Sequence, residues 1–331
     1  MTMPLLEVRN LRKSFRMTDS LGGSQKRLIA VDDLSFTLAE GETLGLVGES
    51  GCGKSTTGKL IVQLLQADQG QVLFAGTELT SLSPRRMRPF RRQLQMIFQD
   101  PFSSLNPRMT VGEILSEPFI IHKLAPGRQI RDLVIQLLDK VGLTAEHEHR
   151  YPHEFSGGQR QRVGIARALA VQPRLIIADE PVSALDLSVQ AQILNLLQEI
   201  QQENNLSYLF IAHDLAVIEH VSDRVAVMYL GKIVELVTAV ELYRQPRHPY
   251  TEALLNAVPI PDPGQPRPAP LSGEVPSPIN PPSGCYFHPR CPYADNLCRE
   301  SDPPLTDCGD GHLVACHHSH QVGRYLLRTS A

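Results

Sequence analysis

The stretch with the most specific chemistry is Gly48-Glu49-Ser50-Gly51-Cys52-Gly53-Lys54-Ser55, which is followed by Thr56. A strand-like run over residues 43–47 leads into it, and a helix-like run follows, with the apolar i,i+4 pairs Leu60/Leu64 and Ile61/Leu65. Glycines let the backbone N–H groups turn toward a phosphate, with the positive end of a helix behind them. The pattern predicts a P-loop in which Lys54 reaches the β- and γ-phosphates of ATP and Ser55 holds Mg²⁺. A plain glycine turn between strand and helix is the alternative.

Polar side chains also end three apolar, strand-like runs: Gln99, the pair Asp179 and Glu180, and His213. An Asp at a strand end beside a P-loop can reach Mg²⁺, and a neighbouring Glu can orient and partly deprotonate the attacking water. We therefore predict that Asp179 and Gln99 bind Mg²⁺ together with Ser55, and that Glu180, His213 and Gln99 are catalytic. A helix-capping acidic pair and a core histidine are the alternatives.

A second anion site is predicted at Ser156-Gly157-Gly158-Gln159, which follows Phe155 and precedes a helical run over residues 160–169. A glycine turn with a Ser hydroxyl at a helix N-terminus suits an anion. One catalytic domain does not need two γ-phosphate sites, so we expect this second site to act in trans, on nucleotide held by a partner's P-loop.

Composition narrows the class of protein. The 331 residues carry 32 Lys and Arg against 35 Asp and Glu, a net charge of −3, which gives no bulk attraction to nucleic acid or anionic lipid. The first ten residues are interrupted by Glu7 and Arg9, and the longest apolar runs are far short of the ~20 residues of a membrane helix. We expect no signal peptide, no membrane span and reduced, cytosolic thiols.

The helices and strands expected around these residues indicate an α/β fold. Strands are expected over residues 5–38 and 70–76, and Phe15, placed on the turn of the first hairpin, is a candidate for stacking on adenine or for the core. A mostly helical insertion, about residues 100–170, is interrupted by prolines such as Pro118. Short apolar runs alternating with the helix 187–204 predict buried parallel strands, and residues 225–235 predict a closing hairpin.

Taken together, these motifs make the chain resemble the ATPases of ABC transporters. Residues 48–55 match the Walker A motif, Gln99 the Q-loop, residues 155–159 the signature motif, residues 175–179 the Walker B motif with Glu180 as catalytic carboxylate, Ser183-Ala184-Leu185-Asp186 the D-loop, and His213 the switch histidine. The resemblance covers roughly residues 5–255. It implies a P-loop NTPase of ABC type with an antiparallel β subdomain and an inserted helical signature subdomain, which binds ATP and Mg²⁺.

Finer motifs are similar to the oligopeptide/dipeptide importers, most of all to the second of their two ATPase subunits. They lie in residues 98–111, 151–159, 183–192, 248–251 and 276–317. Within the first of these, we expect the apolar residues Phe102, Leu105, Pro107 and Met109 to be exposed and to accept a short helix of a membrane subunit. Residues 235–238 depart from a glycine found in many relatives, which we expect to affect only a turn.

The resemblance implies partners and a place in the cell. A sibling ABC ATPase, two membrane permease subunits and, indirectly, an extracytoplasmic binding protein are expected, at the cytoplasmic face of the membrane. No nucleic acid is expected. Cargo stays open between di- or oligopeptides, glutathione-like peptides and nickel complexes. The main expectation is an ATPase subunit that energises peptide import across the membrane. The alternatives are a soluble ABC ATPase that acts on DNA or ribosomes and a nucleotide-sensing regulator.

The C-terminal part is rich in cysteine. After the predicted ATPase domain, residues 1–255, a Pro-rich linker over residues 256–282 is expected to lead to a tail over residues 283–331. Cys285, Cys291, Cys298 and Cys316 are spaced more widely than zinc ligands usually are, with Cys308 as a spare thiol. Disulfides, structural zinc and a [4Fe–4S] cluster are the alternatives. We favour the cluster, which the resemblance also implies.

Overall fold

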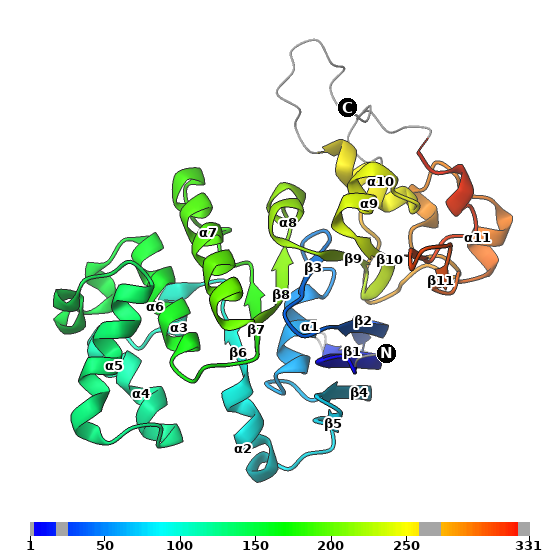
Figure 1. Cartoon of the computed structure of the whole chain (residues 1–331). Helices are drawn as coiled ribbons and strands as arrows, with labels where there is room; N and C mark the ends of the chain where they lie inside the picture. The colour runs from blue at the N-terminus through cyan, green and yellow to red at the C-terminus, as the bar shows by residue number, and fades with distance from the viewer. Residues whose placement is uncertain (1–2, 18–25, 258–272, 324–331) are drawn as a thin grey trace. The chain divides into compact units, whose positions relative to one another are not determined.

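The computed structural model describes residues 3–17, 26–257 and 273–323, and it divides into two compact units (Figure 1). The first unit comprises residues 1–38, 43–80 and 212–331 and contains both the P-loop and the cysteine-rich tail. The second unit comprises residues 39–42 and 81–211. Most of the Pro-rich stretch, residues 258–272, lies outside the described residues. Among the described residues, no helix has the length and apolar character needed to cross a bilayer.

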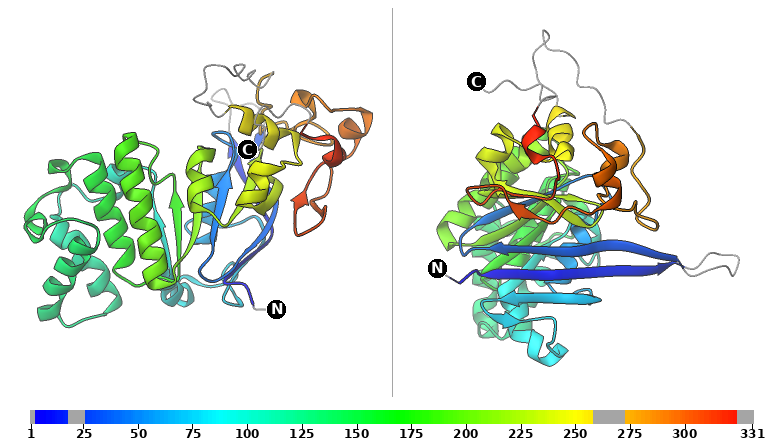
Figure 2. Two further views of the ribbon diagram at one scale, coloured as in Figure 1. Left: turned by 45° about the horizontal axis from the view of Figure 1, so that its top comes forward. Right: turned by 90° about the vertical axis from the view of Figure 1, so that its right-hand side faces the viewer.

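One sheet of the first unit is antiparallel. Its order is β2-β1-β4-β5, built from β1 (Leu6–Met17), β2 (Lys26–Leu38), β4 (Gln69–Phe74) and β5 (Thr77–Glu78). In Figure 2, β1 and β2 run alongside each other as a long hairpin, with β4 beside β1. Leu34, Phe36 and Leu38 alternate toward the core, as strands with one buried face require. The strands predicted over residues 5–38 and 70–76 are confirmed where the structure describes them; residues 18–25 lie outside the described residues.

Other strands of the first unit surround the P-loop. β3 (Thr43–Val47) is entirely buried and pairs in parallel with β9 (Arg224–Tyr229), which forms an antiparallel hairpin with β10 (Lys232–Thr238). The predicted closing hairpin is therefore confirmed. The described residues of this unit form four helices before the tail: α1 (Lys54–Ile61), α8 (Leu215–Val221), α9 (Ala239–Arg244) and α10 (Pro249–Ala257). Because α1 ends at Ile61, the expected i,i+4 pairs with Leu64 and Leu65 do not lie on it.

The described part of the tail continues this arrangement. Its strand β12 (Leu313–Val314) pairs with β10 on one side and with β11 (Thr306–Asp307) on the other. Helix α11 (Asn296–Glu300) and the 3₁₀ turns η3 (His288–Arg290) and η4 (Ser319–Gln321) complete it. The tail thus shares a sheet with the hairpin that flanks β3.

The second unit has a parallel core. β6 (Leu94–Ile97) pairs with β7 (Leu175–Asp179), which pairs with β8 (Ser207–Ala212, whose last residue belongs to the first unit). β7 and β8 are buried along their whole length, as their continuous apolar sequences predict. Helix α7 (Leu187–Asn204) connects them at the predicted bounds.

The rest of the second unit is helical. It consists of α2 (Pro84–Gln93), α3 (Pro101–Ser104), α4 (Val111–His122), α5 (Gly127–Lys140), η1 (Ala145–His149), η2 (Pro152–Glu154) and α6 (Gly157–Leu169). The expectation that Pro118 interrupts a helix is wrong, because Pro118 lies inside α4. Helix α4 starts at a capping box formed by Thr110 and Glu113, and its apolar face, Ile114 with Leu115 and Phe119, is buried, which offsets the hydrogen bond that proline removes.

Candidate functional site

The P-loop connects the buried strand β3 to helix α1, and two of its glycines are required by crowding. Gly48 and Gly53 have φ angles of +153° and +109°. A Cβ atom on Gly48 would lie 2.1 Å from the Met228 carbonyl oxygen, and one on Gly53 would lie 2.0 Å from the Ala30 carbonyl oxygen. Any side chain at either position would therefore push the loop off β9 or β2.

Lys54 is held over this loop. Its ammonium is buried and donates hydrogen bonds to the carbonyl oxygens of Gly48 (2.6 Å) and Glu49 (3.1 Å). The third contact of the ammonium is a long hydrogen bond to Cys52 Sγ at 3.8 Å, and because sulfur is a weak acceptor, a phosphate could replace it. Burial raises the pKa of the neighbouring Cys52 thiol, so Cys52 is a neutral packing residue of the loop.

In the second unit, the structure brings Gln99 and Glu180 together. The Gln99 amide Nε2 donates to Glu180 Oε2 at 2.8 Å, and Asp179, at the end of β7, is buried. Glu180 has a φ of +46°, an uncommon conformation for a non-glycine residue. The Ile211 carbonyl holds it there by accepting from the Glu180 N–H at 2.9 Å. Such strain is typical of side chains with a required orientation.

Two other predicted site residues belong to the first unit. His213 follows β8 and is exposed. Phe15 lies within β1, paired with Leu28, so the expectation that it sits on the hairpin turn is wrong. The residue is 37% exposed, with the Lys13 ammonium 5.6 Å from its ring, and its predicted stacking on adenine stays a prediction.

The signature residues form the N-terminus of α6. Ser156 is the N-cap: its Oγ accepts from the Gln159 N–H at 3.3 Å, and the Gln159 side chain accepts from the Ser156 N–H at 3.0 Å. The Ser156 hydroxyl still has its proton to donate. Ser156 and Gly157 are exposed, so the positive end of α6 faces outward from this unit.

The glycines of the signature serve close packing. A Cβ atom on Gly158 would lie 2.4 Å from Val189 Cγ1, and one on Gly157 would lie 3.3 Å from Leu185 Cδ2. Leu185 belongs to the predicted D-loop, in which Ser183 Oγ donates to the Glu180 carbonyl at 3.2 Å and Asp186 is the N-cap of α7. Ala184 is exposed. The signature helix thus packs directly on the D-loop.

The sequence interpretation missed two residues that hold the P-loop, Tyr250 and Arg290, and the buried carboxylate of Glu235. Tyr250 Oη accepts from the Glu49 N–H at 2.8 Å, and Arg290 of the tail binds the Glu49 carboxylate through two hydrogen bonds. Glu235 lies inside β10 at 0% exposure, where it binds the backbone N–H groups of Arg247 and His248, so the expectation that residues 235–238 affect only a turn is wrong. Residues 248–251 form one of the importer-like motifs, but these contacts themselves could not be predicted, because the partners are distant in the chain.

Comparisons with known proteins place this arrangement in a family. The ABC transporter family matches residues 31–183, and the oligopeptide/dipeptide transporter C-terminal region matches residues 234–298. The probable peptide ABC transporter ATP-binding protein y4tS of Sinorhizobium fredii is 54% identical over 96% of this chain and 90% of its own length. The oligopeptide transport ATP-binding protein OppF of Escherichia coli is 53% identical over 94% of this chain and 95% of its own length. The chain belongs to the ATP-binding subunits of the oligopeptide ABC transporters.

A solved structure agrees with this membership. The dimeric ATP-binding cassette MJ0796, bound to ADP and Pi in a post-hydrolysis state, superposes with a TM-score of 0.64 at 27% sequence identity. The similarity covers 71% of this chain and 98% of that chain. The chain is therefore an ATPase of the ABC type, which binds ATP and Mg²⁺.

In this ABC ATPase, the residues predicted to accept a membrane helix differ in exposure. Phe102 is 51% exposed, with the Arg160 guanidinium 5.1 Å from its ring, and Pro107 is exposed. Leu105 is only 2% exposed, so its predicted exposure is wrong: the Arg167 guanidinium reaches over to the Ser104 carbonyl beside it and ties this segment to α6. Met109 lines a cavity of about 910 Å³ formed by α4, α5 and η1.

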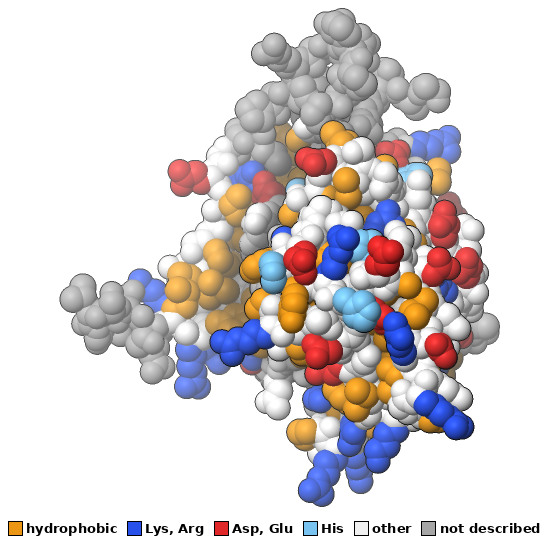
Figure 3. All heavy atoms as spheres, turned by 90° about the vertical axis from the view of Figure 1, so that its left-hand side faces the viewer, with side chains coloured by type: hydrophobic (Ala, Val, Ile, Leu, Met, Phe, Trp, Pro, Cys, Tyr) orange, Lys and Arg blue, Asp and Glu red, His pale blue; other side chains and the backbone are white. Residues whose placement is uncertain are grey.

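That cavity has an apolar rim. Ile120 and Ile121, at the end of α4, are 61% and 49% exposed and line it, and Arg131 and Glu148 form an ion pair at its edge. Figure 3 shows this helical side of the chain, where hydrophobic side chains interrupt a charged surface. The blue group at its lower end is where Figure 1 shows α2, whose arginines Arg85, Arg86, Arg88, Arg91 and Arg92 are exposed.

The tail of this ABC ATPase gathers four thiols. Burial, with a smaller contribution from the neighbouring cysteines Cys285 and Cys298, raises the pKa of Cys291 to about 12. The pKa of Cys316 is raised to about 12 in the same way, and its neighbours are the other three cysteines. Cys308 is not among them. Thiols with raised pKa values are protonated at neutral pH, so they would have to lose these protons to bind a metal ion.

A mixed set of ligands lies at the edge of these thiols. Atoms of Asp295, Cys298 and His318 lie within 4.8 Å of one another, and the His318 ring lies 3.1 Å from the Asp295 carboxylate. Oxygen and nitrogen ligands beside a thiolate are typical of zinc rather than of an iron–sulfur cluster. The described tail therefore holds donors for either of the two groups weighed from the sequence.

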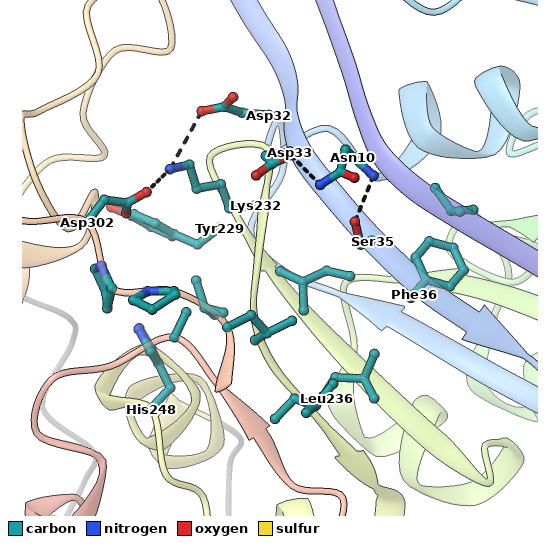
Figure 4. Close-up of a pocket in the computed structure, with 18 of the residues that line it drawn as sticks. Asn10, Asp32, Asp33, Ser35, Phe36, Tyr229, Lys232, Leu236, His248 and Asp302 are labelled. Atoms are coloured by element: carbon teal, nitrogen blue, oxygen red, sulfur yellow. Dashed lines mark hydrogen bonds and ion pairs between the residues drawn. The ribbon is translucent and has the colours of Figure 1, made fainter. Parts of the chain in front are cut away.

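Polar contacts fix the tail to the ATPase along a cavity of about 530 Å³ (Figure 4). Lys232 of β10 pairs with Asp302 of the tail and lies 3.7 Å from Asp32 of β2. Its ammonium also lies 4.2 Å from the ring of Tyr286, whose hydroxyl donates to Asp32 at 2.8 Å. At the other end of the cavity His248 is fully buried, which lowers its pKa to about 3. The tail is thus attached to β2 and β10 through an ion pair, a hydrogen bond and a cation–π contact.

Proposed function

We propose that this chain hydrolyses ATP to energise import of oligopeptides across the cytoplasmic membrane. One observation carries the proposal: the similarity to peptide-transport ATP-binding proteins includes the tail as well as the ATPase motifs. The chain would act at the cytoplasmic face of the membrane, with a sibling ABC ATPase, two permease subunits and an extracytoplasmic binding protein that selects the peptide.

The proposed reaction is in-line attack of water on the γ-phosphate at a composite site. The P-loop with Lys54 and Ser55 holds ATP, Asp179 and Gln99 hold Mg²⁺ with Ser55, and Glu180 orients the water. The partner's signature loop completes the site, and the signature loop of this chain serves the partner's nucleotide. Catalysis then rests on positioning and charge stabilisation. Support comes from the Gln99–Glu180 contact and from the outward-facing N-terminus of α6.

The role of Glu180 is tested by Glu180→Gln in the complete transporter. The variant should bind ATP with unchanged affinity, because the carboxylate contacts the water rather than the nucleotide, and turnover should fall by about 100-fold or more. Glu199→Gln, at an exposed position of α7, is the matched control and should retain full turnover. Near-normal hydrolysis by Glu180→Gln would refute the assignment.

For coupling to the membrane we propose the cavity beside α4 together with Phe102, Pro107 and Met109. Its volume of about 910 Å³ and its apolar rim suit a short helix of a permease subunit, and movement of the second unit on ATP binding would then reach the permease. Ile120→Asp with Ile121→Asp should abolish peptide uptake while ATP binding by the isolated chain is unchanged. Val240→Asp, at an exposed position of α9, is the control. Normal uptake by the Ile120/Ile121 variant would remove the cavity from the coupling path.

For the tail we propose a [4Fe–4S] cluster on Cys285, Cys291, Cys298 and Cys316, with zinc as the alternative. Four thiols that neighbour one another fit such a cluster, and a bound metal would stabilise a segment with few apolar residues. Protein purified without oxygen should be brown and contain iron and sulfide. Colourless protein that contains zinc alone would exclude the cluster and favour the Asp295, Cys298 and His318 group.

Affinity purification from gently solubilised membranes tests the function as a whole. Recovery of two permeases and a second ABC ATPase is the expected result. Recovery of ribosomes or of DNA-repair proteins would contradict the transport proposal and leave the ATPase chemistry in place.

A further inference from the structure

Glu49, the second residue of the P-loop, is held from outside the loop on both its backbone and its side chain. Its N–H donates to Tyr250 Oη at 2.8 Å. Its carboxylate accepts from the two terminal nitrogens of Arg290 at 2.8 and 3.0 Å. The Arg290 side chain is 4% exposed and that of Glu49 is 26% exposed, so water screens this pair only in part.

The negative charge of the Glu49 carboxylate is unfavourable within the P-loop. The loop binds a ligand with several negative charges, and a carboxylate within it repels that ligand. The Lys54 ammonium donates to the carbonyl oxygen of Glu49 itself at 3.1 Å, so the carboxylate is borne by a residue that Lys54 contacts. A carboxylate released from Arg290 would compete with phosphate for Lys54.

Arg290 is itself positioned by the fold of the tail. It ends the turn η3, directly before Cys291, and the Cys285 N–H donates to the Cys298 carbonyl at 2.9 Å across the same segment. Phe287 at the start of that turn is buried against Tyr229 and Tyr250, with ring centroids 5.3 and 5.5 Å apart. The guanidinium can reach Glu49 only while this segment keeps its shape.

We propose that Arg290 is a positioning residue of the nucleotide site, which neutralises Glu49 and so makes ATP affinity depend on the state of the four tail thiols. This inference rests on the ATP site proposed at the P-loop. Metal bound by the thiols would hold the turn and keep the ion pair closed. Loss of metal or oxidation of the thiols would loosen the turn and free the Glu49 carboxylate beside the phosphates.

The charge argument is tested with the full chain and N-methylanthraniloyl-ATP with Mg²⁺, by fluorescence titration. Arg290→Met should weaken binding by about tenfold, a usual size for coupling between sites. The double variant Glu49→Gln with Arg290→Met should bind within about twofold of Glu49→Gln alone. Arg299→Met, an exposed arginine of the same tail, is the control. Unchanged affinity in Arg290→Met, or no recovery in the double variant, would overturn the proposal.

Folding and the role of the thiols are separated by two further variants. Arg290→Lys keeps the charge and should bind the nucleotide within about threefold of the unmodified chain, even if Arg290→Met is too unstable to purify. Cys291→Ser should weaken binding in the unmodified chain and have no effect in the Glu49→Gln background, with metal content measured in both. Equal weakening in both backgrounds would show a merely structural tail and contradict the proposal. If the unmodified chain binds no nucleotide, it is the ATP site, not the role of Arg290, that fails.

Discussion

The P-loop and the signature loop both place glycines at the N-terminus of a helix, but they use them differently. In the P-loop, Gly48 and Gly53 have positive φ angles and lie against carbonyl oxygens of neighbouring strands. In the signature loop, Gly157 and Gly158 have no such strain and instead let α6 approach side chains of the D-loop and α7. One loop is shaped by its own unit to enclose a ligand, and the other is an exposed helix end.

The contacts that hold the two loops in place differ as well. Tyr250 and Arg290, far along the chain, hold Glu49 of the P-loop. The signature loop is held locally, by the reciprocal hydrogen bonds of Ser156 and Gln159. A loop that binds nucleotide within its own chain needs a fixed cavity, whereas a loop that serves a partner's nucleotide needs only an accessible, preformed end. The comparison therefore supports the composite site proposed above.

The largest expected effect comes from crowding the P-loop. Gly53→Ala should weaken ATP binding by about 100-fold, because the new Cβ meets the Ala30 carbonyl at 2.0 Å and the loop must move. Gly51→Ala is the matched control: its φ of +80° is also strained, but nothing lies within 4 Å, so about tenfold is expected. Isothermal titration with ATP measures both, and equal losses would mean that strain rather than crowding shapes the loop.

A smaller effect is expected from crowding the signature helix. Gly158→Ala should lower the free energy of unfolding by about 1–3 kcal/mol, because its Cβ would meet Val189 Cγ1 at 2.4 Å. Val189→Ala in the same chain should restore stability, and ATP affinity of the isolated chain should not change. Gly164→Ala in the same helix has open space and should be neutral or stabilising. Unfolding in urea measures these changes in stability. A loss of ATP affinity in Gly158→Ala would contradict the conclusion that the signature loop does not bind the chain's own nucleotide.

The smallest expected effect is a dependence of stability on pH through His248, which bonds to Tyr250, one of the residues that hold the P-loop. Burial lowers the pKa of His248 to about 3 in the folded chain, against about 6.5 in the unfolded chain. The unfolded chain therefore binds the proton more tightly, and the stability that neutral His248 provides is present above pH 6.5 and is lost as pH falls toward 3. At pH 5 the loss is about 2 kcal/mol.

His248→Asn lacks this titration and retains an acceptor for the Tyr250 N–H, to which His248 Nδ1 now bonds at 3.1 Å. Unfolding in urea at pH 7 and pH 5 should show a larger loss in the unmodified chain than in the variant. Hydrogen exchange should show the acid effect in β3 and α1 before α6. Equal losses in the two proteins would mean that His248 is not the group responsible.

Much of this architecture is predictable because local sequence determines it. The bounds of α7, the parallel strands β7 and β8, and the hairpin of β9 and β10 follow from runs of apolar residues and from turn residues. The glycine spacing of the P-loop likewise identifies its own loop. These features depend on residues that are close together in the sequence, so one sequence is enough to predict them.

What could not be predicted depends on contacts between distant segments. The buried carboxylate of Glu235 binds the His312 side chain of the tail at 2.6 Å, 77 residues away. Leu105 reads as an exposed apolar residue in a polar loop, but it is buried in a segment that Arg167 of α6 holds through the Ser104 carbonyl. Pro118 reads as a helix breaker, but packing of α4 against α5 tolerates it. In each case tertiary contacts override a correct local preference.

The central claim, that the signature loop acts on a partner's nucleotide, is tested most directly with Ser156→Arg in a Glu180→Gln background. ATP binding by the isolated chain and ATP-dependent association with the sibling ATPase would be measured together, by titration and by sedimentation velocity. The account predicts unchanged ATP affinity and complete loss of association, whereas Glu180→Gln alone associates when ATP is added. Loss of ATP affinity in the isolated chain, with association retained, would contradict it and assign the signature loop to the chain's own nucleotide.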